Sequence, residues 1–411
     1  MLHTNGERLK ASLLEMGRVG GTPAGGVTRP SLTDTDRQGR DLLASWARSS
    51  GLAVRVDDLG NQYLRLEGAD PATNPVLIGS HLDTVPLGGK FDGALGVLVG
   101  LEVVRTLLDA GIRPRRPIEV VNFSNEEGAR FEPAMMSSGV LAGCFTPEYF
   151  YSRQDREGKS LGAELERIGY KGSSASRPRS IHAYIEPHIE QGPVLEAEGL
   201  ALALVEGILG IVWMNVTLTG QPEHAGSSPM RRRRDPLVAA GRIVAGVRDV
   251  ALEYPDPVVS TVGRLQPFPG VINQISGRVV MSVEMRHPTE PGLSEIAERM
   301  ERLIRRIAAE ERVDAEIEVF WRIAPTVFDQ RIVAALEESL RSLGLPYRRM
   351  TSGPGHDAKY ISEIAPAGML FVRTVGGRSH CETEGIEWED AHAAADVVLN
   401  AVLRLSEVDW T

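Results

Sequence analysis

Five residues of this chain have side chains that bind metal ions and stand in turns beside Gly, Pro or Ser: His81, Asp92, Glu127, His188 and His380. Imidazole and carboxylate groups suit Zn²⁺, Mn²⁺ or Co²⁺. Any one of these histidines alone would be more typical of a surface or hydrogen-bonding residue. Together they predict a metal site, and two ions about 3.5–4 Å apart would use this number of ligands. Asp92 is the best bridge, because a carboxylate can donate one oxygen to each ion.

Two further carboxylates next to these ligands could serve catalysis. Glu126 directly precedes Glu127, and neighbours in a turn can point in different directions. If Glu127 binds an ion, Glu126 is free to take a proton from a metal-activated water and pass it to a leaving amine. A solvated acidic pair is the alternative. Asp83 follows His81 by two residues and could hold its ring, or make only a local turn hydrogen bond.

The ligands follow apolar segments that are typical of an α/β sheet. Residues 75–80 and 117–124 are predicted strands, and residues 93–110 between them are a predicted helix. Such a βαβ unit implies parallel strands in a covered sheet. His81 and Glu126 then lie at the carboxyl ends of strands, where open α/β sheets place their sites.

The rest of the chain is predicted in the same way. We expect helices at 5–17, 36–50, 328–344 and 389–406, a hairpin at 52–66 and a strand at 367–372. The glycine-rich stretch at 20–29 is expected to be a flexible connector, with a binding loop near the site as the less favoured alternative. From about residue 208 the pattern changes to a β-α-β-β-α-β order, which is typical of a ferredoxin-like unit. Its predicted strands are 211–219, 258–265, 278–286 and 314–323, and its predicted helices are 235–252 and 294–311.

The predicted fold is therefore α/β, with a mixed, mostly parallel sheet flanked by helices and an inserted α+β domain. We expect the main domain at residues 1–208 and 325–411 and the inserted domain at residues 209–324.

Composition narrows the classes of function. The formal net charge is −10, from 45 basic and 55 acidic residues, which argues against a general nucleic-acid binder. Two cysteines, Cys144 and Cys381, cannot make a disulfide framework. The N-terminus lacks a signal-peptide pattern, and no apolar stretch reaches the ~20 residues that span a membrane. We expect a cytoplasmic protein with no membrane or nucleic-acid partner.

Several motifs resemble known families. The dinuclear metallopeptidase superfamily, with its zinc-exopeptidase-like fold, aminoacylases and carboxypeptidases, is matched by His81–Pro86, Asp92-Gly93, Asn125–Gly128 and His380. The branch with N-carbamoyl-L-amino-acid hydrolase, β-ureidopropionase and allantoate amidohydrolase is matched by Gly88–Val97, Asn125–Phe131, His188–Pro193, His224–Met230 and Gly355–Ala358. The resemblance covers nearly the whole chain.

The resemblance implies roles for individual residues. Two divalent ions would be bound by His81, His188, Glu127 and His380 around a bridging Asp92, with Glu126 as general acid and base. The substrate would be held by Gln191, His224, Asn273 and Arg286. A guanidinium at Arg286 can grip an α-carboxylate with two hydrogen bonds. His224 would stabilise the developing oxyanion, from the same chain or from a partner subunit.

His356 would line the site without binding metal, and the inserted domain would act as a lid and as the contact of a homodimer. The predicted function is hydrolysis of the carbamoyl C–N bond of N-carbamoyl-L-amino acids to amino acid, CO₂ and ammonia. Allantoate amidohydrolase and β-ureidopropionase share the reaction and all of these residues. A peptidase or aminoacylase, and a non-catalytic metal-binding protein, are more remote alternatives.

Overall fold

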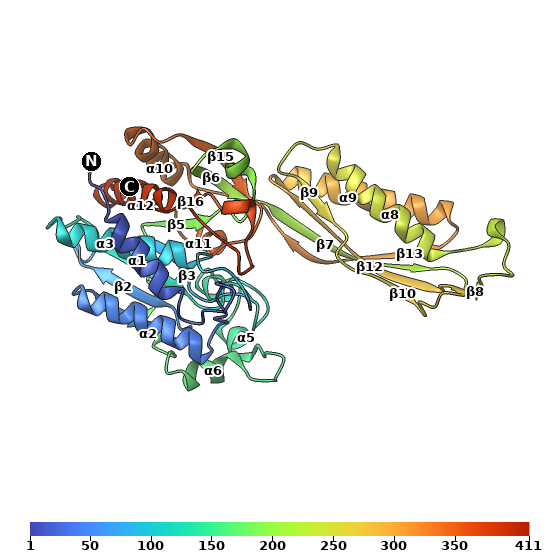
Figure 1. Cartoon of the computed structure of the whole chain (residues 1–411), viewed down its shortest axis with the longest axis horizontal. Helices are drawn as coiled ribbons and strands as arrows, with labels where there is room; N and C mark the ends of the chain where they lie inside the picture. The colour runs from blue at the N-terminus through green and yellow to red at the C-terminus, as the bar shows by residue number, and fades with distance from the viewer. Residues whose placement is uncertain (411) are drawn as a thin grey trace. The chain divides into compact units, whose positions relative to one another are not determined.

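The computed structural model describes residues 1–410. The chain divides into two compact units, which are described separately below. Unit 1 comprises Met1–Glu206 and the chain from Phe328 onward, and unit 2 comprises Gly207–Val327 (Figure 1).

A nine-stranded sheet lies in unit 1 except for its short edge strand β14 and the end of β6. Its four central strands, β4, β3, β5 and β16, are parallel to one another. The next strands on either side, β2 and β6, pair antiparallel with this central group. In order across the sheet the strands are β1 (Ala53–Val56), β2 (Gln62–Leu66), β4 (Ile118–Phe123), β3 (Val76–His81), β5 (Ala183–Ile189), β16 (Ala367–Val372), β6 (Leu202–Ile208) and β14 (Thr326–Val327), with β15 (Tyr347–Ser352) also paired to β6. The predicted α/β fold with a mainly parallel central sheet is confirmed.

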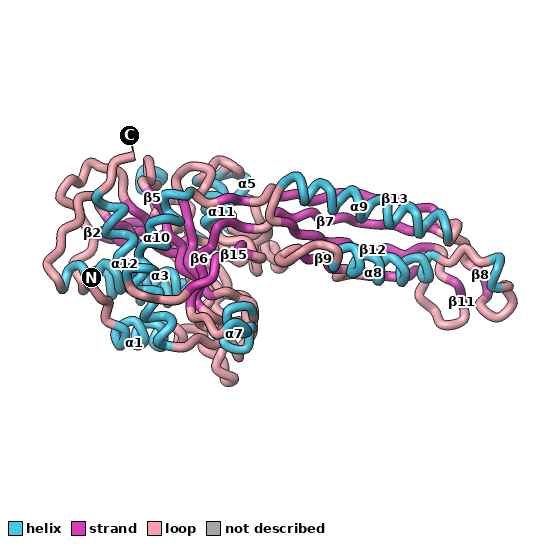
Figure 2. The backbone as a smooth tube through the Cα atoms, turned by 90° about the horizontal axis from the view of Figure 1, so that it is seen from above, coloured by secondary structure: helices cyan, strands magenta, loops and turns pink. Residues whose placement is uncertain are grey.

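Helices flank this sheet (Figure 2). They are α1 (Gly6–Met16), α2 (Asp34–Ser49), α3 (Ala94–Asp109), α4 (Met136–Leu141), α5 (Pro147–Ser152), α6 (Leu161–Arg167), α7 (Val194–Glu198), α10 (Gln330–Ser342), α11 (Ala358–Ile361) and α12 (Trp388–Glu407), with short 3₁₀ turns at Ser174–Ser176 and Val375–Gly377. Helix α3 packs directly on the sheet, because a Cβ at Gly96 would lie only 2.3 Å from the carbonyl oxygen of Pro187. This contact places the first turn of α3 beside the end of β5.

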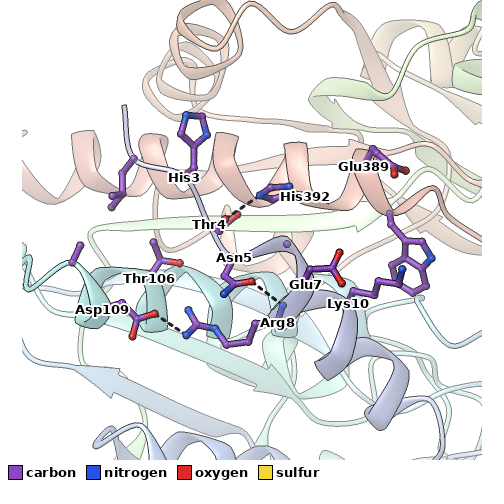
Figure 3. A pocket seen from close by; sticks show the side chains of 14 residues that line it. His3, Thr4, Asn5, Glu7, Arg8, Lys10, Thr106, Asp109, Glu389 and His392 are labelled. Carbon is purple, nitrogen blue, oxygen red and sulfur yellow. Dashed lines mark hydrogen bonds and ion pairs between the residues drawn. The ribbon is translucent and has the colours of Figure 1, made fainter.

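The N-terminal segment is tied to helices α3 and α12. The backbone N–H and the hydroxyl of Thr4 each donate to Asp396 Oδ1 at 2.7 Å, and the N–H of Asn5 donates to Glu102. A cavity of about 620 Å³ lies beside this segment, between α1, α3 and α12 (Figure 3). None of the predicted metal ligands lines it.

The expected flexible connector at residues 20–29 was wrong. Val27 makes β-bridges to Gly21 and Gly88, and the side chain of Arg29 is fully buried. The Arg29 guanidinium donates to three backbone carbonyls, those of Leu82, Met16 and Val19. Because the Leu82 carbonyl lies between His81 and Asp83, the loop supports the strand end that carries the first predicted ligand.

Unit 2 has a five-stranded antiparallel sheet with the order β10-β12-β7-β13 and with β9 also paired to β12. Its elements are β7 (Gly210–Thr219), β8 (Glu223–His224), a 3₁₀ turn at Met230–Arg232, α8 (Pro236–Leu252), β9 (Val259–Thr261), β10 (Leu265–Phe268), β11 (Gln274–Ile275), β12 (Arg278–His287), α9 (Glu290–Glu310) and β13 (Asp314–Ile323). Side chains of β7 and β12 alternate between buried and partly exposed, so one face of this sheet packs on α8 and α9.

Two boundaries in unit 2 differ from the prediction. The single strand expected at 258–265 is two short strands, β9 and β10, which both pair with β12 on either side of a break at residues 262–264. Helix α9 begins at Glu290 instead of residue 294, because Thr289 caps it by accepting from the N–H of Gly292, and Pro291 suits the first turn. Within residues 1–410, no helix has both the length and the apolar character needed to span a bilayer.

The buried face of α9 should control the stability of unit 2. Ile296 is fully buried in the core between α9 and the sheet. We expect Ile296→Ala to lower the free energy of unfolding by about 2–5 kcal/mol, since it leaves a cavity among packed side chains. Arg302→Ala, on the exposed face of the same helix, should change it by less than about 0.5 kcal/mol. Denaturant unfolding followed by circular dichroism measures both, and equal losses would contradict the packing described.

Candidate metal centre

All five predicted ligands meet in unit 1, in two groups that share one carboxylate. The first group is His81, Asp92 and His188, and the second is Asp92, Glu127 and His380. Within each group the ligand atoms lie within 4.8 Å of one another. The first group is fully buried, whereas the side chain of His380 is 50% exposed. The second group is therefore the one open to solvent.

Backbone carbonyls orient the two buried histidines. The Nδ1 of His81 lies 2.9 Å from the carbonyl oxygen of Asp83, and the Nδ1 of His188 lies 2.9 Å from that of Ile189. A carbonyl only accepts, so each Nδ1 carries the hydrogen. Each Nε2 is then the nitrogen that faces an ion, and the carbonyl fixes the plane of the ring.

Asp92 lies between the histidines of both groups. Its Oδ1 is 3.1 Å from His188 Nε2, and its Oδ2 is 3.1 Å from His380 Nε2. The following residue is Gly93, whose φ is +64° and whose Cβ would lie 2.4 Å from the His81 ring. Only glycine fits there, because both the backbone angle and the close approach exclude a side chain.

The role expected for the Asp83 side chain needs correction. The contact with the His81 ring is made by the backbone carbonyl of Asp83 and not by its carboxylate. The carboxylate instead accepts from the N–H groups of Glu126 and Glu127, at 3.3 and 3.4 Å. Asp83 thus connects the strand end that carries His81 with the turn that carries the acidic pair.

Glu126 is buried at the edge of the first group. Its Oε2 lies 3.4 Å from His81 Nε2. Burial, together with the charges of Asp357 and Glu127, raises the pKa of Glu126 well above its ordinary value. A carboxyl group in this environment can hold a proton at neutral pH, as a general acid requires.

Electrostatics and donor chemistry both fit divalent ions. Burial alone would lower the pKa of His188, but the hydrogen bond to Asp92 and the charges of Asp92 and Glu186 together outweigh burial and raise the pKa to about 9. The hydrogen bond to Asp92 likewise raises the pKa of His380. Burial raises the pKa of Glu127, and the nearby charge of Asp92 adds to this effect. The cluster thus gathers carboxylates that need compensating positive charge, and it presents them with imidazole nitrogens, which is a donor set that suits zinc, manganese or cobalt.

Two other predicted residues contact this cluster. The amide of Gln191 donates to Asp92 Oδ2 at 3.0 Å, and its Nε2 lies 3.4 Å from His380 Nε2. His356 is buried with its ring 4.4 Å from that of His188, and its Nε2 pairs with the hydroxyl of Ser352. Both residues therefore line the predicted ligands.

The remaining predicted residues, His224, Asn273 and Arg286, belong to unit 2. His224 and Asn273 are neighbours there, since β8 pairs with β11 and the N–H of Ala225 donates to the carbonyl of Asn273. Arg286 forms an ion pair with Glu284 near the other end of β12. The structure therefore brings the first two together and leaves the third apart from them.

Sequence reasoning missed two residues that contact the cluster, Ser379 and Glu384. The hydroxyl of Ser379 lies 3.1 Å from Asp92 Oδ2, and Glu384 accepts from the N–H of Asp92. The only signal in the sequence was that both lie in the same turn as His380.

Comparison with known proteins identifies the family. Residues 77–404 match the model of peptidase family M20/M25/M40, which is most of the chain. The chain belongs to this family. The predicted resemblance to the metallopeptidase superfamily is thereby confirmed, and the relatives that follow confirm its carbamoyl-hydrolysing branch.

Individual relatives of this family are similar over their full length. The N-carbamoyl-L-amino-acid amidohydrolase of Rhizobium meliloti is 45% identical over 98% of this chain and 97% of the relative. The allantoate amidohydrolase of Bacillus subtilis is 36% identical over 90% of each. A crystal structure of an amidase of the hydantoinase/carbamoylase family from Burkholderia multivorans has a TM-score of 0.95 at 45% identity, covering 98% of both chains.

Metal binding at this centre should compete with protons. Because the pKa of His188 is raised to about 9 in the ion-free protein, this ring is protonated at neutral pH and must lose a proton to bind an ion. Affinity for Zn²⁺ should therefore fall as the pH is lowered below 9, by about tenfold per pH unit for each proton displaced. Calorimetric titration in buffers of different ionisation enthalpy measures the protons released. An affinity that stays constant between pH 9 and pH 6 would contradict this arrangement.

Proposed function

We propose that this protein hydrolyses the carbamoyl C–N bond of N-carbamoyl-L-amino acids, releasing the amino acid, CO₂ and ammonia. The observation that carries the proposal is the pair of ligand groups that share Asp92, with the buried Glu126 beside them. The identity of 45% over nearly the whole length of an N-carbamoyl-L-amino-acid amidohydrolase supports this choice of substrate.

Glu126 is the proposed general base and acid. Bound at His81, Asp92, Glu127, His188 and His380, two divalent ions would supply Lewis-acid activation of water and of the ureido carbonyl. Glu126 takes the proton of the attacking water on its carboxylate and returns it to the leaving nitrogen. Its raised pKa favours the protonated form that the second transfer needs. The carbamate released then decomposes to CO₂ and ammonia.

Five polar residues are proposed to hold the substrate: Gln191, His224, Asn273, Arg286 and His356. The guanidinium of Arg286 is suited to the α-carboxylate, because it can form two parallel hydrogen bonds. The amides of Gln191 and Asn273 would add further hydrogen bonds, and His224 would stabilise the oxyanion. His356 would support this set through its contact with the ring of His188.

The layout of unit 2 bears on how these residues act. Asn273 lies just before β12, which begins at Arg278, whereas Arg286 lies near its end, so the two are separated by roughly 26 Å or more along the strand. Figure 1 shows β8 and β9 toward opposite ends of β12. One small substrate cannot contact both ends of this strand. We therefore propose that His224 and Asn273 of one copy serve the substrate held by Arg286 of a second copy in a homodimer.

The identity of the ions and the location of the protein are part of the proposal. We propose zinc, manganese or cobalt as the native ions, a homodimer that forms through the inserted unit, and a cytoplasmic location. Elemental analysis of the purified protein and sedimentation at several concentrations test the first two.

Allantoate is the second candidate substrate, since the allantoate amidohydrolase of Bacillus subtilis is 36% identical over 90% of its length. Ammonia release should be measured with N-carbamoyl-L-amino acids, N-carbamoyl-β-alanine and allantoate, each with Zn²⁺, Mn²⁺ and Co²⁺. Turnover highest with an N-carbamoyl-L-amino acid supports the proposal. Turnover of none of them would overturn it.

Replacement of the general base should separate catalysis from metal binding. We expect Glu126→Gln to lower kcat by about 100- to 10,000-fold, because the amide cannot accept and return the proton. The metal content should stay at the wild-type level, since Glu126 is not among the grouped ligands. Assays of ammonia release together with elemental analysis measure both, and a fully active variant would contradict the role.

Mixing two inactive variants tests the contribution of a second copy. Arg286→Ala and His224→Ala should each lose most activity alone. When the two are mixed and allowed to exchange subunits, half of the dimers contain one intact site, so about a quarter of the wild-type activity should return. As a control, Arg286→Ala should be mixed with Arg286→Lys. Both variants lack the guanidinium, so the mixture should show no activity beyond the sum of the two. Absence of recovery despite proven exchange would show that one chain supplies both residues.

A further inference from the structure

One buried carboxylate outside the ligand set joins the two segments that carry Asp92 and His380. Glu384 is only 4% exposed. Its Oε1 accepts from the backbone N–H groups of Phe91 and Asp92, at 2.9 and 3.1 Å. Its Oε2 accepts from the hydroxyl of Ser379 at 2.7 Å. Both oxygens are thus used, one on each segment.

Ser379 completes this connection. Its hydroxyl lies 2.7 Å from Glu384 Oε2 and 3.1 Å from Asp92 Oδ2, so its single hydrogen faces two carboxylates. Ser379 directly precedes His380 and is 287 positions from Asp92 in the sequence. The pair formed by Ser379 and Glu384 therefore sets how the His380 turn lies against the Asp92 turn.

Gly89 shows how closely the two segments pack. A Cβ at this position would lie 1.9 Å from the Oε1 and the Cδ of Glu384. No side chain fits unless the carboxylate moves away from the N–H groups that it accepts from. The glycine thus gives Glu384 access to the backbone of Phe91 and Asp92.

We propose that Glu384 is a positioning residue for the ion bound by Asp92, Glu127 and His380. The inference rests on the proposed dinuclear centre. Within residues 1–410, Glu384 makes no hydrogen bond to His81 or His188. These two rings are oriented instead by the carbonyl groups of Asp83 and Ile189. Asp92 is shared by both groups, but only the second group also depends on the His380 turn that Glu384 holds through Ser379. Loss of Glu384 should therefore loosen this second group more than the first.

The test is a titration of the metal-free protein with Co²⁺, followed by visible absorption and by competition with a chelator. Wild-type protein should bind two ions. In Glu384→Ala the site formed by Asp92, Glu127 and His380 should lose about 10- to 100-fold in affinity, which is typical when a residue that orients a ligand is removed. The other site should change by less than about threefold.

Three further variants separate positioning from a general loss of structure. Glu384→Gln should keep most of the affinity, because its amide oxygen accepts from the same two N–H groups and its NH₂ can donate to Ser379. Gly89→Ala should reproduce the loss of Glu384→Ala, since it displaces the carboxylate without removing it. Glu387→Ala, an exposed position three residues further on, should match the wild type.

Thermal melting of each metal-free variant completes the experiment. The proposal holds if the Co²⁺ affinity of one site falls in Glu384→Ala and Gly89→Ala but not in Glu384→Gln. The metal-free melting temperatures of Glu384→Gln and Gly89→Ala should stay within a few degrees of the wild type. Two wild-type-like sites in Glu384→Ala, or an equal loss at both sites, would overturn it. If the wild type itself fails to bind two ions, the proposed dinuclear function fails, and this result is distinct from a failure of the variants alone.

Discussion

The site depends on the contacts of the Asp92 carboxylate with the histidines around it. This one carboxylate contacts His188 through one oxygen and His380 through the other, and it belongs to both ligand groups. Burying so many ionisable groups is costly unless each charge is paired and hydrogen-bonded. Burial alone would raise the pKa of Asp92, but the two histidines outweigh burial and hold the pKa well below its ordinary value. The surrounding chain is built to keep this carboxylate charged and in place.

The backbone provides most of that support. Carbonyls of Asp83 and Ile189 orient the two buried rings, and N–H groups of the Glu126 turn bind the Asp83 carboxylate. These contacts arise because β3, β4 and β5 are parallel neighbours whose carboxyl ends meet at one edge. Strands β3 and β5 pair only as far as Ile78 and Ile185, so their ends separate at this edge, where the loops carry the ligands.

Unit 2 differs from unit 1 in the arrangement of its sheet and core. Its core lies between one face of an antiparallel sheet and helices α8 and α9. The long strand β12 keeps Arg286 away from the β8–β11 ladder that carries His224. The five candidate metal ligands thus belong to unit 1, whereas the proposed recognition of substrate also depends on residues that one copy of unit 2 keeps apart.

The sequence by itself determined the fold class and the order of the ferredoxin-like unit, and it pointed to the five candidate ligands that the structure brings together. Alternating and helical periodicities, and polar residues placed just after apolar runs, are local signals that survive without coordinates. Only the tertiary structure decided that the carbonyl of Asp83 and not its carboxylate holds His81, that Arg29 is buried, and that Glu384 joins the segments of Asp92 and His380. The contact between Asp83 and His81 is local, but the sequence does not show which oxygen of Asp83 faces the ring. Arg29 and Glu384 bind segments that are distant in the chain, 292 positions away for Glu384 and Asp92, and such a contact leaves no periodic trace in a single sequence.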